Sequence, residues 1–181
     1  MHGVIFSSLR EFVGEVYGAE VARDLFRGEP LYFMTEAYPD EQLLELIGRA
    51  VETTGADADE LVFEFGAFTV QNTFARLYRA FFEISPDARS FMLPLEQRIH
   101  ALVRSTLPNA KPPQLKISEH GADGVRIVYS SPRRLCVLLR GLATGAARYY
   151  GETLEIEEPR CMLRGDEACT FELRFSPAPA A

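Results

Sequence analysis

The chain has 181 residues, of which 47% are hydrophobic and 25% charged, and its formal net charge is -7. This length and composition are typical of one globular domain rather than of a disordered segment. The acidic balance argues against a nucleic-acid-binding surface, because phosphate contacts need clustered Lys and Arg. No apolar run approaches the roughly 18 residues of a membrane span, and the first residues lack the basic start of a signal peptide. We therefore expect a cytoplasmic protein that binds neither nucleic acid nor membrane.

Apolar residues recur at helical spacing through residues 1–110, which we expect to form a mainly helical half. Glycine and proline mark the ends of five helices, predicted over residues 5–17, 39–54, 57–65, 68–82 and 85–107. The last of these begins at Ser85-Pro86-Asp87 and ends at Pro108. It places His100 beside an apolar stripe formed by Phe91, Met92, Leu95, Ile99, Leu102 and Val103.

Residues 111–175 are typical of a sheet. Runs rich in β-forming residues at 114–118 and 125–129 flank a Gly-Ala-Asp-Gly turn and predict a hairpin. A helix over 134–150, whose small residues allow close packing, precedes strands at 153–157 and 169–175, and we expect a frayed tail from Ser176 to the end. The predicted fold class is α+β, in which a helical subdomain is followed by an antiparallel β-sheet with one long helix against it. We expect residues 1–181 to form a single domain.

The segment around His100 and the Tyr-x-Ser-x-Arg run after it contain the groups needed to hold a haem. A neutral imidazole is a common proximal ligand of haem iron, although a histidine beside an apolar stripe is often a structural residue. In an extended segment, a spacing of two places Tyr129, Ser131 and Arg133 on one face. A guanidinium matches one propionate and the hydroxyls can donate to the other. Taken alone, such a run is more often ordinary polarity at a strand end, and it points to a haem only together with His100 and Pro113.

A wider pattern connects these residues. The chain opens with Met1, Gly3, Ile5 and Phe6, Pro113 stands thirteen residues after His100, and Tyr-Ser-Ser-Pro-Arg leads into Leu135–Gly145. With this pattern the chain resembles the H-NOX family, the haem-nitric oxide/oxygen binding domains related to the sensor domain of soluble guanylate cyclase. The resemblance is strongest at the helix with His100, at Pro112-Pro113 and at the Tyr-Ser-Ser-Pro-Arg segment. It is most similar to the bacterial stand-alone type. The resemblance covers nearly the whole chain and implies haem b held between the helical half and the sheet.

The resemblance also implies a role for each matching residue. His100 would be the proximal iron ligand, and Pro113 would press on the porphyrin and bend it. The other residues would hold the propionates or line the haem pocket: Tyr129, Ser131 and Arg133 for the propionates, and Ile5, Leu142 and Leu138 for the pocket.

The gas that the haem would bind is predicted from the residues on the distal side of this pocket. Oxygen-binding members of the family carry a tyrosine five residues after the motif arginine, where this chain has Leu138. Position 9, aromatic in some relatives, is Leu9, and Asn72 matches a polar position that in oxygen binders supports the tyrosine. Bound dioxygen carries partial negative charge and needs a donor more than nitric oxide does. We therefore predict a nitric oxide sensor that excludes oxygen. Its output would be a separate protein, as in related bacterial systems, either a histidine kinase or a cyclic-di-GMP enzyme (diguanylate cyclase or phosphodiesterase).

The three cysteines suggest a second site. Cys161 and Cys169 flank a tight turn, and Cys136 begins the long helix. Three thiolates and one further ligand make a familiar structural zinc set, but three small buried hydrophobic residues would give the same pattern. Some H-NOX relatives bind zinc with matching cysteines and a histidine, in whose place this chain has Glu158. The alternative function is therefore a thiol or zinc redox sensor on the same fold.

An enzyme is not expected. The sequence has no Ser/His/Asp set, no glycine loop for phosphate and no carboxylate pair with a reaction to serve. Besides His100 there are two histidines, His2 at the terminus and His120 in a turn, and we expect both in solvent.

Overall fold

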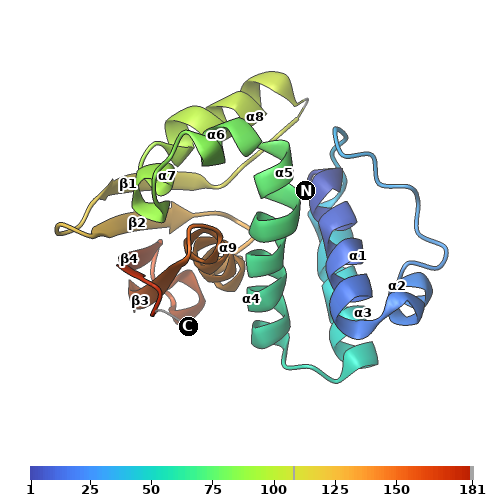
Figure 1. Ribbon diagram of the computed structural model, residues 1–181. Helices are drawn as coiled ribbons and strands as arrows, with labels where there is room; N and C mark the ends of the chain where they lie inside the picture. The colour runs from blue at the N-terminus through green and yellow to red at the C-terminus, as the bar shows by residue number, and fades with distance from the viewer. Residues whose placement is uncertain (108, 180–181) are drawn as a thin grey trace.

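The helices and strands follow the order that the sequence predicts, in a computed structural model that describes residues 1–107 and 109–179 (Figure 1). The fold is α+β, as predicted. The first part is helical, with two π-helical turns (η1, η2): α1 (Gly3–Tyr17), α2 (Ala19–Leu25), α3 (Asp40–Thr54), α4 (Ala58–Phe68), η1 (Thr69–Phe74), α5 (Ala75–Leu77), α6 (Arg79–Glu83), α7 (Ala88–Met92), η2 (Glu96–His100) and α8 (Ala101–Thr106). The second part consists of β1 (Gln114–Glu119), β2 (Gly124–Ser130), α9 (Cys136–Tyr149), β3 (Glu152–Arg160), the short 3-10 turn η3 (Met162–Arg164) and β4 (Cys169–Pro177).

The strands form one antiparallel sheet in the order β1-β2-β4-β3. The hairpin predicted at Gly121–Gly124 is confirmed, because β1 pairs with β2 from Gln114 opposite Ser130 onward. Along β4, alternate side chains are buried, since successive residues of a strand point to opposite faces. These residues, which form a core with α9, are Cys169, Phe171, Leu173 and Phe175.

A separate core fills the space between α1, α3 and α4. Residues of α1 at helical spacing bury one face of that helix, namely Phe6, Leu9, Phe12 and Val13. They pack against Leu43 and Leu46 of α3 and Phe65 of α4. The predicted helix ends at Gly18 and Gly55 are confirmed, and both glycines have positive φ angles that favour glycine. The side chain of Leu138 reaches this core from α9.

The prediction that Gly66 ends a helix is wrong. Gly66 lies inside α4, which continues through η1 into α5. The glycine is needed because α9 crosses here, and a Cβ at Gly66 would lie 2.6 Å from the carbonyl oxygen of Leu138. A Cβ at Gly141 of α9 would lie 2.0 Å from the carbonyl oxygen of Phe63. The small residues predicted to allow close packing on the long helix therefore do so at this crossing.

The single helix predicted from Ser85 onward is also wrong, because Leu93 and Pro94 form a turn between α7 and the following helical residues. Proline lacks the N–H of a helical ladder and its ring clashes with the preceding turn. The new start is η2, and α8 then runs to Thr106. Pro108, predicted to end the helix, lies outside the described residues.

The strands are longer than predicted at the C-terminal end of the chain. Ser176, expected in a frayed tail, belongs to β4 and pairs with Thr153, and the pairing continues through Pro177 opposite Glu152. The amide of Ala178 then donates to the carbonyl oxygen of Gly151 at 3.0 Å. Short α2 was not predicted, because its seven residues carry only a brief apolar pattern.

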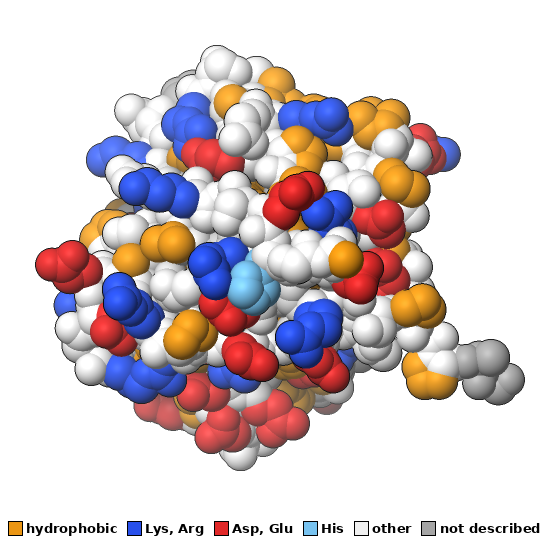
Figure 2. All heavy atoms as spheres, turned by 90° about the vertical axis from the view of Figure 1, so that its left-hand side faces the viewer, with side chains coloured by type: hydrophobic (Ala, Val, Ile, Leu, Met, Phe, Trp, Pro, Cys, Tyr) orange, Lys and Arg blue, Asp and Glu red, His pale blue; other side chains and the backbone are white. Residues whose placement is uncertain are grey.

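On the face shown in Figure 2, basic and acidic side chains are interspersed, and acidic ones gather along the lower edge. Among the described residues, no helix has both the length and the apolar character needed to cross a membrane.

Candidate functional site

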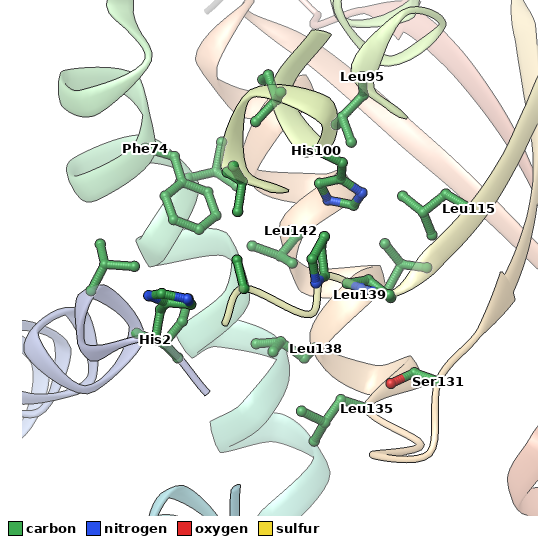
Figure 3. A pocket seen from close by; sticks show the side chains of 18 of the residues that line it. His2, Phe74, Leu95, His100, Leu115, Ser131, Leu135, Leu138, Leu139 and Leu142 are labelled. Atoms are coloured by element: carbon green, nitrogen blue, oxygen red, sulfur yellow. The ribbon is translucent and has the colours of Figure 1, made fainter. Parts of the chain in front are cut away.

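A cavity of about 250 Å³ lies between the helical part and the sheet (Figure 3). Its walls come from α1, from η1 and the residues after it, from η2 and α8, from β1 and β2, and from α9. The structure brings together at this cavity all eight residues predicted to hold a cofactor: His100, Tyr129, Ser131, Arg133, Pro113, Ile5, Leu142 and Leu138. Aliphatic and aromatic side chains form most of the remaining wall, as in cavities that bind largely apolar molecules.

His100 faces the cavity with one nitrogen anchored. Its Nδ1 lies 2.7 Å from a carboxylate oxygen of Glu96, and the other oxygen of Glu96 accepts from Arg104 at 2.7 Å. An ionised carboxylate only accepts hydrogen bonds, so Nδ1 carries the hydrogen and the lone pair of Nε2 is free for a metal. Burial lowers the pKa of His100 and outweighs the opposing effect of Glu96. The imidazole is therefore neutral near pH 7, the form that coordinates metals.

The π turn explains which residues of this helix line the cavity. A π turn contains an extra residue, which rotates the following side chains by about 100° relative to a regular α-helix. Leu102, expected in the buried stripe, is 38% exposed, whereas His100 and Val103 line the cavity. The His100 side chain is 16% exposed.

Arg133 enters the cavity wall held by two partners. Its Nε donates to Asp40 at 2.7 Å, and Nη1 donates to the carbonyl oxygen of Lys111 at 2.8 Å. Asp40 is the first residue of α3, so this ion pair joins the turn after β2 to the helical part. Burial disfavours the charge of Asp40, but hydrogen bonds from the Met1 amine and Arg133 outweigh it and lower the Asp40 pKa.

Tyr129 and Ser131 are both buried beside Arg133 in the cavity wall. The hydroxyl of Tyr129 accepts from the amide of Leu135 at 3.1 Å, and that of Ser131 accepts from the amide of Arg133 at 3.3 Å. The predicted extended run stops at Ser130, because Pro132 cannot donate to a ladder. A turn after Ser131, rather than strand alternation, therefore brings Arg133 to the cavity.

Leu138 and Leu142 extend from α9 into the space across from the His100 ring (Figure 3). Leu138 is 8% exposed and the α4–α9 crossing fixes its position. Leu9 is buried in the helical core, and the Asn72 amide donates to the carbonyl oxygen of Phe68 on its own helix at 3.0 Å. Neither Leu9 nor Asn72 is among the residues lining the cavity.

Some polar residues of the cavity wall were not predicted from the sequence, among them Tyr78 and His2. Tyr78, just after α5, lines the cavity next to Phe74, and burial raises its pKa. His2 also lines it, and both of its ring nitrogens are buried, so the expectation that His2 lies in solvent is wrong. No local pattern identifies these residues, because contacts with distant segments bury them. His120, also expected in solvent, is partly exposed, and its Nε2 lies 3.4 Å from a carboxylate oxygen of Glu172.

The four residues of the suggested metal site also come together. The ligand atoms of Cys136, Cys161, Cys169 and Glu158 all lie within 4.8 Å of one another. The Cys161 sulfur is 3.8 Å from that of Cys136 and 3.9 Å from that of Cys169. Tetrahedral zinc with bonds of about 2.3 Å to sulfur requires sulfur–sulfur separations of about 3.8 Å. One carboxylate oxygen of Glu158 is buried and has no hydrogen-bond partner in the part of the chain that the structure describes.

The environment of these thiols favours their neutral form when no cation is present. Burial is the main cause that raises the pKa of Cys136 and of Cys169. A bound divalent cation reverses this preference, because a coordinated thiol is deprotonated. The cluster is therefore suited either to a metal or to three inert thiols, and its four ligand atoms converge on one point as a metal requires.

The helical part and the sheet thus enclose a cavity lined by the imidazole of His100 and, on another wall, by Arg133, Tyr129 and Ser131. The chain belongs to the Haem-NO-binding family, whose profile matches residues 2–158. Domains of this family are sensors that signal to partner proteins and are not themselves catalytic.

Solved H-NOX structures share this fold. The Fe(II)NO form of an H-NOX protein from S. oneidensis is 23% identical and covers 97% of this chain and 99% of its own, with a TM-score of 0.89. The unliganded Fe(II) form from K. algicida is 19% identical with full coverage of both chains and a TM-score of 0.84. Soluble guanylate cyclase 89Da of Drosophila melanogaster is 28% identical over 172 residues, which are 87% of this chain. The chain spans only 24% of the length of that cyclase.

Proposed function

We propose that this chain binds haem b and senses nitric oxide at the ferrous iron, without forming a stable oxygen complex. The observation that carries the proposal is the buried imidazole of His100, with Nδ1 fixed by Glu96 and Nε2 left for a metal. Haem, when bound, supplies an iron atom that takes up diatomic gases. The cavity fits this group because it combines that ligand with apolar walls and a carboxylate-binding end.

In this proposal each cavity residue has a separate task. His100 coordinates the iron, and Arg133, Tyr129 and Ser131 bind the propionates. Pro113, which precedes β1, contacts the porphyrin from the sheet, while Ile5 and Leu142 complete the apolar wall. His100 is the last residue of η2, directly before α8. Any movement of its ring is therefore transmitted to α8 through the Glu96–Arg104 contact.

The preference for nitric oxide rests on Leu138. An apolar side chain cannot donate a hydrogen bond to the partial negative charge of bound dioxygen, whereas nitric oxide needs little such help. Tyr78 is the hydroxyl of the cavity wall outside the propionate-binding set, among the described residues. If this phenol donated a hydrogen bond to bound dioxygen, it would stabilise an oxygen complex despite Leu138.

Absorption spectra of the reduced, haem-loaded protein test this proposal. We expect the unliganded spectrum to change with nitric oxide and to show no stable oxy form in air. Leu138→Tyr should create an oxy form, because the new hydroxyl can donate to dioxygen. A stable oxy form in the wild type would contradict the exclusion of oxygen, and its loss in Tyr78→Phe would identify the donor. A protein that retains no haem would contradict the whole proposal.

We infer that the output is a separate signalling protein, either a histidine kinase or a cyclic-di-GMP enzyme. The support is the resemblance to stand-alone bacterial sensors, together with the connection of His100 to α8. The test measures the activity of such a partner with the unliganded and the nitric oxide-bound domain. Equal activity with both forms would contradict regulation by the gas.

A thiol or zinc sensor is the second candidate function, favoured by the unpartnered oxygen of Glu158 beside the three sulfurs. Metal analysis of the purified protein should find one zinc per chain. Glu158→His should retain the metal and Glu158→Ala should weaken its binding. Protein isolated without metal and with three reactive thiols would instead support a thiol sensor.

A further inference from the structure

His2 is a titratable residue of the cavity wall to which the proposed function gives no role. It precedes α1, and its backbone is fixed by a bridge to Ala37 and by accepting from the amide of Ile5 at 3.0 Å. His2 and His100 enter the cavity from different sides, and Leu142 lies between them in the view of Figure 3. The position of the His2 ring is therefore set by backbone structure and not by a side-chain partner.

Both ring nitrogens of His2 are buried, and neither has a hydrogen-bond partner among residues 1–107 and 109–179. A buried polar group without a partner is unfavourable, and native proteins keep few of them without a reason such as a ligand. Burial lowers the pKa of His2, and the positive charges of the Met1 amine and Arg133 lower it further. The ring is thus neutral near pH 7, with one N–H to donate.

His2 lies near the Arg133 end of the cavity, because the amine of the preceding residue, Met1, donates to Asp40 at 2.6 Å and Arg133 donates to the other oxygen of the same carboxylate at 2.7 Å. At that end, Arg133 already donates through Nε to Asp40 and through Nη1 to Lys111. Asp40 also offsets its positive charge. A molecule with two carboxylates therefore needs donors besides this guanidinium, and His2 has an unused one.

We propose that His2 donates a hydrogen bond to a propionate of the bound haem. This inference rests on the proposed haem site and adds to it a residue from the helical part. With this hydrogen bond, two segments hold the same pair of carboxylates: the residue before the start of α1 and the turn after β2. The bound molecule then joins the two parts of the fold at its carboxylate end as well as at His100.

The test compares haem with haem dimethyl ester, which has the same ring and iron but no carboxylates. The rate of haem transfer to an excess of apomyoglobin measures release from wild type, His2→Leu and His2→Gln. Loss of a hydrogen bond to a charged group predicts that His2→Leu releases haem about tenfold faster. His2→Gln keeps an N–H donor and should release haem at nearly the wild-type rate. With the dimethyl ester, all three proteins should behave alike.

His120→Leu is the matched control, because His120 lies at the β1–β2 hairpin beside Glu172 and not at the cavity. Faster release of haem and its ester by the same factor in His2→Leu would show that His2 only packs, and would overturn the proposal. Equal release of haem by wild type and His2→Leu would also overturn it. A six-coordinate ferrous spectrum that His2→Leu converts to five-coordinate would make His2 an iron ligand instead. If the wild type binds neither haem nor the ester, the proposed haem function itself fails.

Discussion

The cavity and the cysteine cluster are both built around α9, yet they differ in how far apart their parts lie. The cluster takes its ligands from the start of α9, from β3, from the residue just after β3 and from the start of β4, and its ligand atoms lie within 4.8 Å of one another. The cavity collects residues from α1, η2, β2 and α9 and leaves about 250 Å³ between them. Convergence on a point suits a single ion, whereas donors at the rim of an apolar space suit a large cofactor that carries two carboxylates on one edge. A substitution that abolishes ligand binding at one site should therefore leave binding at the other site unchanged.

The strongest test of this independence is His100→Ala. It removes the proposed iron ligand, so haem affinity should fall by more than the roughly 10- to 100-fold expected on losing a supporting partner. Glu96→Gln removes only the charge that fixes Nδ1, so its loss of haem affinity should lie within that roughly 10- to 100-fold range. Zinc content should remain unchanged in both variants. Haem titration followed by metal analysis measures the two sites in one sample, and loss of zinc in His100→Ala would contradict their independence.

The reciprocal change is Cys169→Ala. It removes one sulfur from the cluster and should abolish stoichiometric zinc, since three remaining ligands hold the ion poorly. Because β4 pairs with β2 at Tyr129, we expect a small change in haem affinity and none in the gas spectra. A change in the coordination of the iron in Cys169→Ala would show that the two sites are coupled through the sheet.

Gly141→Ala should damage the cavity while leaving the cluster intact. The added Cβ would lie 2.0 Å from the carbonyl oxygen of Phe63, so α4 and α9 must separate. Overpacking of this kind costs about 1–3 kcal/mol of unfolding free energy. Gly48→Ala is the matched control, because a Cβ there meets no atom within 4 Å. Chemical denaturation of both variants measures the difference, and equal stabilities would contradict a close crossing at Gly141.

The parts of the fold with regular patterns were predictable from the sequence. Periodicity identified α1 and α3, and the turn at Gly121–Gly124 identified the first hairpin. Prediction from the sequence is wrong where one residue type has two physical roles: a glycine can end a helix, but Gly66 permits a helix crossing. It is wrong again at Pro94, because the apolar periodicity continues past a proline that interrupts the helical ladder.

The residues of the candidate site also differ in whether the sequence predicts them. His100 and the residues around Arg133 form a compact sequence pattern, so a family resemblance could locate them. Glu96 stands one turn before His100, and that spacing could have predicted their contact. His2 and Tyr78 line the cavity, and Asp40 holds Arg133 there, through contacts between distant segments that no local spacing predicts.

The smallest expected effect is that of Asp40→Asn, which tests whether the charge of Asp40 holds Arg133 at the cavity. The Asp40 pKa lies below its usual value of 3.8, so ionised Asp40 stabilises the fold above that pH. This contribution is lost as the pH falls through the lower pKa of the folded protein. The side chain is 32% exposed, and screening by solvent limits the ion pair with Arg133 to about 1 kcal/mol at most.

Urea denaturation of the haem-free protein from pH 7 down to strongly acidic pH measures this effect. Wild type should be the more stable protein at pH 7, and its advantage over Asp40→Asn should vanish at the acidic end, where the carboxyl group is protonated. Glu155→Gln is the matched control, since Glu155 pairs with Arg174 on an exposed part of the sheet. An advantage that stays constant with pH would mean that Asp40 stabilises the fold by shape and not by charge. Arg133 would then be held ready for a carboxylate by packing alone.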